Sequence, residues 1–323
     1  MSNPTLEIDF PINYQHSCPV VKLPQRLTLI ESISFKKLCA KLIEQNREIS
    51  KIVFDFENTW FIDSSGIGAL IGIHVIARAY QQELIFQQVQ PPVMEILEMA
   101  ELTEIFQIQS TKLRVSKGIA THPSIDSSLK RLIDVIGAII GLIITAIIFL
   151  PIAIAIKLDS PGPVLFSQTR CGWLGQKFKI WKFRSMCIDA ETRKATVSNQ
   201  AAGAFFKNSF DPRITRVGGF LRRTSLDEFP QFWNVLKGDM SLVGTRPPIP
   251  DEVAIYEVPE WQRLNVKPGI TGEWQVNGRS QINNFEDVIK LDLRYQKEWS
   301  LLHDLQLILK TVLIIFDKNS GAV

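Results

Sequence analysis

Hydrophobic positions in the first hundred residues follow two different periods. Residues 51–58 (KIVFDFEN) and 84–89 (LIFQQV) are apolar and rich in β-branched or aromatic side chains, as buried strands are. Residues 66–80 (GIGALIGIHVIARAY) place apolar side chains at helical spacing, and residues 91–102 (PPVMEILEMAEL) open with prolines, which suit the first turn of a helix. Strands that alternate with helices predict a small α/β domain over residues 1–110.

A polar turn, Asp-Ser-Ser-Gly, leads into the helix expected at residues 66–80. Asp63, Ser64 and Ser65 can each cap that helix, and capping alone explains both serines. Residues 20–110 also resemble the STAS family, the small domains of anti-anti-sigma factors and sulfate transporters, with this turn as the main shared motif. The resemblance implies a regulatory protein as partner and nominates Ser64 or Ser65 as a phosphorylation site.

A long apolar run follows the N-terminal domain. Residues 111–128 lack a hydrophobic period and are rich in serine, lysine and small residues, which predicts a linker. The 22 residues from Val135 to Ile156 carry no charge, and a straight helix of that length would reach roughly 33 Å, enough to cross a bilayer core. Pro151 predicts a bend. Cations flank both ends of the run, so the positive-inside rule favours neither orientation of the helix in the membrane. A bent re-entrant helix and a straight transmembrane anchor both fit these features.

Composition and charge further limit the fold and the function. The 323 residues are 46% hydrophobic and 21% charged, which is ordinary for globular protein and leaves room for two domains. The first ten residues are neither basic nor apolar, so no signal peptide is expected and the N-terminal domain should stay in the cytosol. The four cysteines show no metal or disulfide spacing. Between Asp159 and Arg246 there are 14 Lys and Arg but 7 Asp and Glu, which predicts an anionic ligand.

Two adjacent carboxylates, Asp227 and Glu228, lie in this basic stretch. On a helix such neighbours diverge by about 100°, so they would hold different positions around a substrate. The local sequence also fits a capping box from Ser225 to Glu228, whereas the density of cations favours a phosphate site at a helix start. In FKIWKFRSM, strand alternation would put Lys182 and Arg184 on one face, either as solvated edge cations or as ligands.

Residues 128–316 closely resemble the bacterial sugar transferases, the monotopic polyprenyl-phosphate sugar-1-phosphate transferases. Four motifs in order carry this resemblance: LKRLID, GPVLFSQTRCGWLGQKFKIWKFRSM, RITRVGGFLRRTSLDEFPQFWNVLKGDMSLVGTRP and VKPGITGEWQVNGRS. The resemblance implies transfer of a sugar-1-phosphate from a UDP-sugar to undecaprenyl phosphate, with release of UMP and a requirement for Mg²⁺. It also implies a mixed α/β domain over residues 129–323 that holds a re-entrant membrane helix, at the cytosolic face of the inner (cytoplasmic) membrane. The reaction would be the first membrane step of polysaccharide or glycoconjugate synthesis.

The resemblance also gives individual residues their expected roles. Asp227 matches the nucleophile that forms a covalent aspartyl-phosphosugar, and Glu228 matches its acidic neighbour, expected near the metal or the lipid phosphate. Both carboxylates are candidate metal ligands. The basic positions that bind substrate are matched by Lys182, Arg184, Arg222 and Arg246. Two positions depart from the family pattern: Leu150 replaces a frequent serine before the bending proline, and Thr245 replaces the proline before Arg246.

Two other classes of function stay open at this point. A membrane-tethered STAS binding module without catalysis explains the first 110 residues and the apolar run, but it leaves the basic motifs without a purpose. A metal-dependent glycosyltransferase that moves only the sugar usually carries an Asp-x-Asp motif, and residues 159–246 have none. No nucleic-acid partner is expected. The sequence leaves open which sugar is transferred, what binds the STAS domain and whether the chain forms a homodimer.

Overall fold

The computed structural model describes residues 8, 10–15, 18–109, 121–200, 208, 210–278, 282 and 284–316. Backbone contacts divide the chain into two compact units. The first comprises Met1–Thr121, Leu174–Gln176 and Tyr256–Asn265, and the second comprises His122–Trp173, Lys177–Ile255 and Val266–Val323. Two short segments from far along the sequence thus belong to the first unit. Of the expected linker, residues 111–120 lie outside the described residues, and the remainder includes α4 (Pro123–Asp126).

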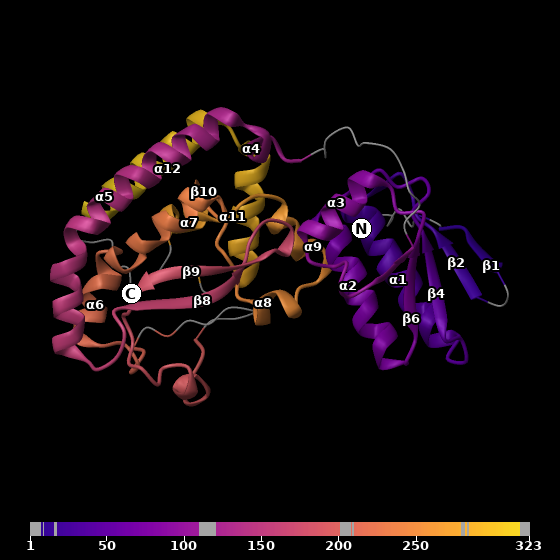
Figure 1. Cartoon of the computed structure of the whole chain (residues 1–323), viewed down its shortest axis with the longest axis horizontal. Coiled ribbons are helices and arrows are strands. Elements are labelled where there is room, and N and C mark those ends of the chain that lie inside the picture. The colour runs from indigo at the N-terminus through magenta and orange to yellow at the C-terminus, as the bar shows by residue number, and fades with distance from the viewer. Residues whose placement is uncertain are drawn as a thin grey trace, which may run out of the picture. The chain divides into compact units, whose positions relative to one another are not determined.

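The first unit is built on a five-stranded sheet in the order β1-β2-β4-β6-β7 (Figure 1). Four of its strands are parallel, and β1 pairs antiparallel with β2 at one edge. Parallel strands covered on both faces need apolar side chains, and Phe54 and Phe86 are fully buried at the centre of the sheet. The strands predicted at residues 51–58 and 84–89 are confirmed as β4 and β6. The bounds are β1 (Ile12–Gln15), β2 (Cys18–Lys22), β4 (Lys51–Asp55), β6 (Glu83–Gln87) and β7 (Gln107–Gln109).

Three helices join these strands, as the sequence predicts for an α/β domain. They are α1 (Leu29–Gln45), α2 (Ser64–Ala79) and α3 (Pro91–Met99), and a short parallel pair, β3 (Arg26–Leu27) and β5 (Phe61–Ile62), precedes α1 and α2. The Asp63 carboxylate caps α2 by accepting the N–H groups of Ser65 and Gly66 at 2.9 and 3.1 Å. The helices predicted at residues 66–80 and 91–102 are therefore confirmed.

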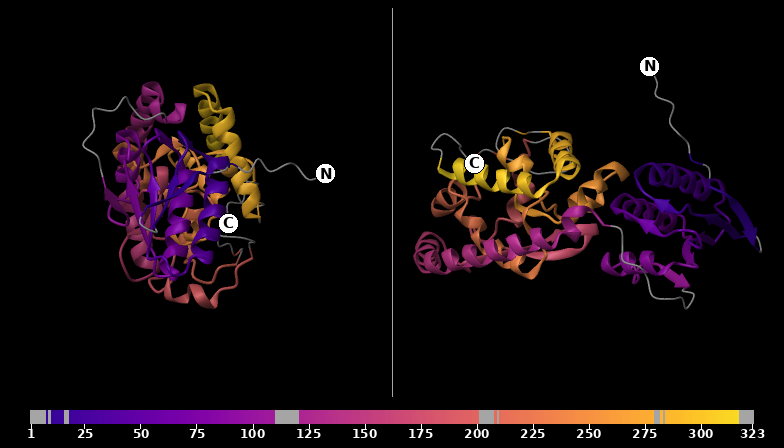
Figure 2. Two further views of the ribbon diagram at one scale, coloured as in Figure 1. Left: turned by 90° about the vertical axis from the view of Figure 1, so that its right-hand side faces the viewer. Right: turned by 90° about the horizontal axis from the view of Figure 1, so that it is seen from above.

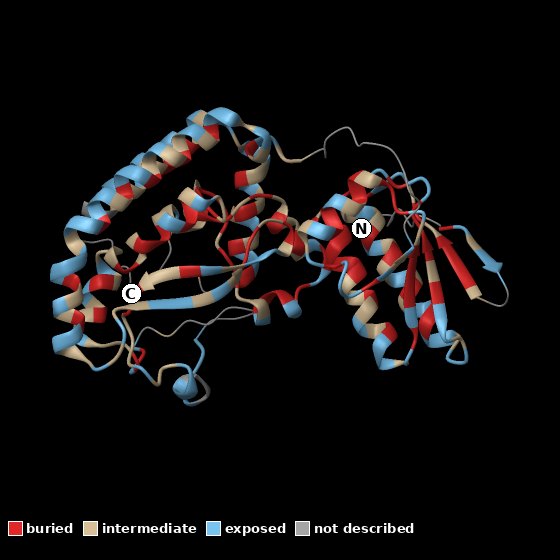
Figure 3. Ribbon diagram, viewed as in Figure 1, coloured by how far each residue is buried: buried red, intermediate tan, exposed pale blue. Residues whose placement is uncertain are grey.

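The second unit contains α5 (Ser128–Asp159), a helix of 32 residues. Figure 1 shows that α5 changes direction sharply, and Pro151 lies inside it, where the proline ring removes the hydrogen bond to the carbonyl of Ile147. Among the described residues α5 is the one helix long and apolar enough to cross a membrane. Only 22% of its most apolar 18-residue stretch is buried, and Figure 3 shows exposed residues along its outer side. That exposure is not the pattern of a core helix, so the predicted membrane-length apolar helix is confirmed.

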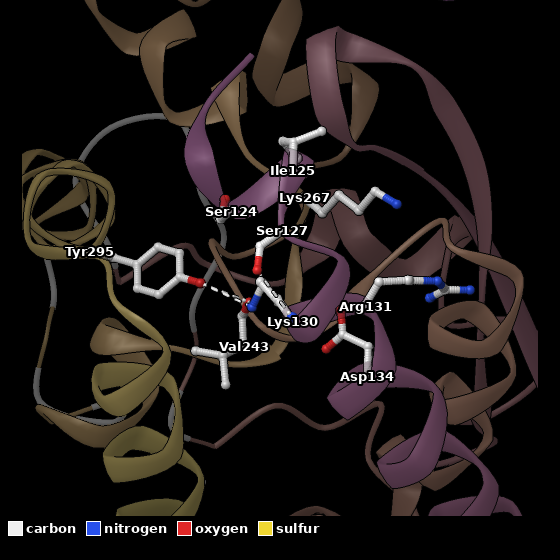
Figure 4. A pocket seen from close by; sticks show the side chains of 9 residues that line it. All are labelled: Ser124, Ile125, Ser127, Lys130, Arg131, Asp134, Val243, Lys267 and Tyr295. Atoms are coloured by element: carbon white, nitrogen blue, oxygen red, sulfur yellow. Dashed lines mark hydrogen bonds between the residues drawn. The ribbon is translucent and has the colours of Figure 1, made fainter.

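Charged side chains in the first turns of α5 point into the protein. Lys130 Nζ donates to Asp304 Oδ2 at 2.6 Å and to the Val243 carbonyl at 3.1 Å. Asp134 Oδ1 accepts the N–H of Leu242 at 2.9 Å. Buried charges require such partners, so these contacts fix the start of α5 to the folded unit. Figure 4 shows Lys130 and Asp134 at a cavity of about 20 Å³, which is lined by Ser124, Ile125, Ser127, Lys130, Arg131, Asp134, Val243, Lys267 and Tyr295.

The remaining elements of the second unit pack against α5 and against each other. An antiparallel hairpin is formed by β8 (Leu165–Cys171) and β9 (Lys177–Phe183), and a parallel pair by β10 (Ser241–Val243) and β11 (Gly269–Thr271). One buried cluster joins Ala138 of α5 to Ile180 of β9 and Val235 of α7. In Figures 1 and 2, α5 and α12 run along the same side of this unit. The other elements used below are α6 (Arg216–Arg223), the 3-10 helix η3 (Leu226–Gln231), α7 (Phe232–Lys237), α8 (Pro250–Ala254), α11 (Phe285–Glu298) and α12 (Leu301–Phe316).

Candidate active site

One cavity of the second unit brings Asp227 together with the basic residues that the sequence singles out. Its volume is about 310 Å³, at the small end of the range for small-molecule sites. The walls come from the β8–β9 hairpin, the loop after β9, α6, η3 and α8. Six basic and three acidic side chains line it, which favours an anionic ligand. They are Arg170, Lys182, Arg184, Arg213, Arg222 and Arg246, with Glu191, Asp227 and Glu252.

A strained turn presents Asp227 to this cavity. Ser225, just before η3, has φ 54° and ψ 17°, the left-handed region that non-glycine residues adopt at a cost of roughly 1–2 kcal/mol. Its side chain makes no cap, and only its carbonyl accepts the N–H of Glu228, at 3.2 Å. The capping-box alternative is therefore not what forms here. Asp227 is only 5% exposed, in the cavity wall.

Glu228 takes a different position from its neighbour, as the sequence predicts. Its carboxylate pairs with Lys182 Nζ at 2.8 Å, and both side chains are mostly buried. Lys182 comes from β9 and also lines the cavity. The two adjacent acids therefore have separate surroundings: Asp227 faces the cavity, and Glu228 holds one of the cavity's lysines in place.

Arg246 is held in a fixed orientation by an acid that sequence reasoning missed. Its two terminal nitrogens donate to the two carboxylate oxygens of Glu252, at 2.7 and 3.0 Å. Glu252 is 4% exposed on α8, and a bidentate pair of this kind fixes the plane of the guanidinium. The preceding residue, Thr245, is buried, and its carbonyl accepts the N–H of Gly269 at 2.9 Å. On the other side of the arginine, the Pro248 carbonyl accepts the N–H of Cys171 at 2.8 Å, so the loop that carries Arg246 is held on both sides.

Arg170 is a second residue of the cavity to which the sequence assigns no role. It lies within the motif GPVLFSQTRCG, which is the only signal that could have found it. Its guanidinium donates to the Pro247 carbonyl and to Gln168 Oε1, each at 2.8 Å. Burial, followed by the nearby charge of Arg246, lowers the pKa of Arg170 to about 10, so it still carries its charge at neutral pH.

Arg184 and Arg222 also line the cavity, from different elements. Arg222 belongs to the last turn of α6. Arg184 follows β9, and its terminal nitrogens donate to the carbonyls of Ser160 and Pro161 at 2.7 and 2.6 Å. It therefore joins the end of α5 to the wall of the cavity. Whether Arg184 also binds substrate stays a prediction.

The donor set permits a magnesium ion that is shared with a phosphate ligand. Among the described residues, no group of three or more His, Cys, Asp or Glu side chains could hold a metal by itself. Mg²⁺ usually takes only one or two protein carboxylates and completes its shell with substrate phosphates and water. Asp227, in the lining of the cavity, offers one such carboxylate. Glu228 is paired with Lys182, and its role as a metal ligand stays a prediction.

The two serines nominated for phosphorylation lie elsewhere, in the first turn of α2. Ser64 and Ser65 have no exposed surface, and neither hydroxyl has a hydrogen-bond partner. A kinase could reach either hydroxyl only after local opening of the first unit. Their phosphorylation stays a prediction.

Comparison with known proteins identifies two families along the chain. Residues 125–318, more than half of the chain, match the family model described as bacterial sugar transferase, and residues 9–114 match the model of the STAS domain. The anti-sigma factor antagonist SpoIIAA in its unphosphorylated form is a solved structure similar to 32% of this chain, over 90% of its own length, with 18% identity and a TM-score of 0.27.

Curated relatives match the larger, C-terminal part. The galactosyl transferase CpsE of Streptococcus agalactiae serotype III (strain NEM316) is 50% identical over 188 residues, which is 58% of this chain and 42% of CpsE. The UDP-glucose:undecaprenyl-phosphate glucose-1-phosphate transferase of Escherichia coli (strain K12) is 40% identical over 226 residues, 64% of this chain and 46% of that relative. The chain spans about half the length of these relatives. With a STAS domain ahead of its membrane-length helix, the chain belongs to the bacterial sugar transferase family.

Proposed function

We propose that this protein transfers a hexose 1-phosphate from a UDP-sugar to undecaprenyl phosphate. The observation that carries this proposal is the cavity in which Asp227 lies among six basic side chains. Phosphoryl transfer asks a protein mainly for positioning and for neutralisation of phosphate charge, which this lining can supply. The relative from Escherichia coli is named for UDP-glucose and undecaprenyl phosphate, so its name supports the same donor and acceptor classes here.

The proposed reaction has two balanced steps. An Asp227 carboxylate oxygen attacks the β-phosphorus of the UDP-sugar, the bond from that phosphorus to the bridging oxygen breaks, and UMP leaves with the bond electrons. The sugar phosphate is then an acyl phosphate on Asp227. A phosphate oxygen of undecaprenyl phosphate attacks the same phosphorus, and the carboxylate leaves and is restored. Because the steps are separate, the soluble donor and the lipid acceptor need not bind together.

The surrounding residues have complementary tasks in this scheme. Arg246, held by Glu252, and Arg170, held by the Pro247 carbonyl, present fixed cations to the diphosphate. Lys182 offers a further cation and keeps Glu228 in place. Asp227 would hold Mg²⁺, joined by Glu228 once its pair with Lys182 opens, and the bound ion would supply additional neutralisation of phosphate charge.

A re-entrant course of α5 on the cytosolic side of the inner membrane is part of this proposal. Both ends of α5 are held by the same folded unit: Lys130 binds the Val243 carbonyl near the start, and Arg184 binds the Ser160 carbonyl at the end. A straight crossing would place these two ends on opposite sides of the bilayer. Arg184 also lines the cavity, so the cavity lies beside the end of the apolar helix, and a re-entrant course would bring it near the lipid phosphate.

Cysteine labelling from one side of sealed vesicles tests this course. Ser128 and Leu158 are exposed near the two ends of α5, so each can be replaced by cysteine in a background where the partly exposed Cys18 and Cys187 are serine. We expect both positions to react with an impermeant maleimide from the cytosolic side. The background protein without added cysteine is the control. Labelling from opposite sides would show that α5 crosses the membrane.

The activity itself is tested with a panel of UDP-hexoses and undecaprenyl phosphate in membranes. We expect at least one donor to release UMP in amounts equal to the lipid-linked sugar phosphate formed. Release of UDP would instead indicate a glycosyltransferase that moves the sugar alone. The absence of any nucleotide release across the panel would leave the STAS binding module as the better reading.

A further inference from the structure

Two segments within the sugar transferase match belong, by their contacts, to the first unit. They are Leu174–Gln176, the turn between β8 and β9, and Tyr256–Asn265, which forms α9 (Val258–Trp261) and the 3-10 helix η4 (Gln262–Asn265). Within that unit, α9 packs on α1 and α2, and η4 packs on α2. The STAS helices thus hold pieces of the transferase sequence.

Two glycines make room for one indole in this packing. A Cβ at Gly68 of α2 would lie 2.4 Å from Cγ of Trp261, and a Cβ at Gly175 would lie 3.0 Å from Cζ3 of the same side chain. Trp261 is only 5% exposed as a result. The indole therefore contacts the STAS helix at Gly68 and the tip of the transferase hairpin at Gly175. Close packing of this kind leaves no space for even one methyl group at Gly68.

Hydrogen bonds and an ion pair also join the segment Tyr256–Asn265 to α1 and α2. Asn265 Oδ1 accepts the N–H of Ser64 at 2.9 Å, and the Asn265 side chain also hydrogen-bonds the Asp63 carboxylate. Asn265 thereby completes the cap of α2 and lies over the buried serine turn. At the other end of the segment, Glu257 Oε2 pairs with Lys36 Nζ of α1 at 3.0 Å.

Both docked segments are continuous in sequence with residues of the cavity. Glu252, which holds Arg246, lies four residues before Tyr256. Val266, directly after Asn265, is buried beside Val243. The tip at Leu174–Gln176 joins β8, which carries Arg170, to β9, which carries Lys182. All residues that line the cavity come after residue 162, so these connections offer the STAS domain a path to the cavity.

We propose that the α1–α2 face of the STAS domain is an internal docking surface for these two segments, and that docking fixes Arg246, Arg170 and Lys182 for binding the donor. The coupling to the cavity rests on the proposed function, whereas the docking does not. The surface joins the Asp63–Gly66 turn, so anything that opens this turn, including charge placed on Ser64 or Ser65, would release the segments. Release lowers the affinity for the UDP-sugar.

Chemical cross-linking of a cysteine pair in the full chain tests the docking without reference to activity. Lys36→Cys with Glu257→Cys replaces the ion pair, in a background with Cys18 and Cys187 changed to serine. We expect a short bifunctional maleimide to bridge this pair, because the ion pair joins the ends of two long side chains and gives a cross-linker of similar reach the same path. Lys37→Cys with Glu257→Cys is the matched control, because the next residue on α1 points about 100° away. Failure of the first pair to cross-link, or equal cross-linking of both pairs, would overturn the docking.

A matched pair of glycine substitutions on α2 tests the coupling. Gly68→Ala drives a methyl group into Trp261, whereas a Cβ at Gly72 meets only the flexible end of Lys36, at 3.1 Å. In Gly68→Ala we expect faster deuterium exchange in peptides covering 174–176 and 256–265. We also expect a KM for the UDP-sugar raised roughly two- to thirtyfold with kcat nearly unchanged, since binding is lost equally in ground and transition states. Gly72→Ala should match wild type in both.

The outcomes separate the two parts of the proposal. Faster exchange in Gly68→Ala with an unchanged KM overturns the coupling to the cavity and keeps the docking. Unchanged exchange overturns the docking as well. If the wild-type chain releases no UMP with any donor, the proposed function fails, and the cross-linking and exchange results still decide whether the STAS face holds these segments.

Discussion

Replacement of Asp227 by asparagine is expected to abolish transfer, with a loss in kcat of roughly 10⁴-fold or more, because it removes the oxygen that attacks phosphorus while keeping the side chain's shape. The fold should survive, since asparagine fills the same place in the wall of the cavity. Initial rates of UMP release measure the loss. Incubation of the wild-type protein with UDP-sugar labelled in the sugar, without lipid acceptor, should attach one labelled phosphosugar to the chain.

The control for this experiment is Asp251→Asn. Asp251 is exposed at the start of α8 and does not line the cavity, so the same chemical change there should leave both turnover and labelling intact. Thermal unfolding compares the stability of the two variants. Equal labelling of the Asp227→Asn protein and the wild type would show that another residue is the nucleophile.

Replacement of Arg246 by alanine is expected to lower kcat/KM about 10²- to 10³-fold, the range for removing one preorganised donor from a developing phosphate charge. Its two bonds to Glu252 hold the guanidinium in one plane. Arg246→Lys keeps the charge and loses the bidentate geometry, so it should recover only part of the activity. Glu252→Gln leaves the arginine present but less well oriented, and we expect an intermediate loss.

Steady-state rates at several UDP-sugar concentrations distinguish these variants. Removal of Arg246 also leaves a buried carboxylate, Glu252, without its bidentate partner, so a fall in stability must be measured beside the loss of activity. The double variant Arg246→Ala with Glu252→Gln removes that charge and provides the control. A wild-type kcat/KM in the folded Arg246→Ala protein would contradict a role in binding phosphate.

Much of the fold could be predicted because the signals are local. Apolar runs rich in β-branched or aromatic side chains mark β4 and β6 at residues 51–58 and 84–89, and helical spacing marks α2. The uncharged run around Pro151 predicts both the length and the bend of α5, since hydrocarbon thickness and the chemistry of the proline ring depend on no distant contact. The motif that contains Asp227 could likewise be found from neighbouring residues alone.

What only the tertiary structure decided depends on partners far apart in the chain. In the sequence, Lys130 is one of the cations that flank the apolar run. In the structure it is buried against Asp304, 174 residues away. Hydrophobic periodicity cannot report such a pair, because each partner becomes meaningful only once the two segments lie side by side. For the same reason the sequence did not predict that Glu252 and Arg170 line the cavity, or that Trp261 packs on Gly68. Sequence by itself therefore determined the elements and the nucleophile candidate, and tertiary contacts determined which charges are available for chemistry and which hold the scaffold.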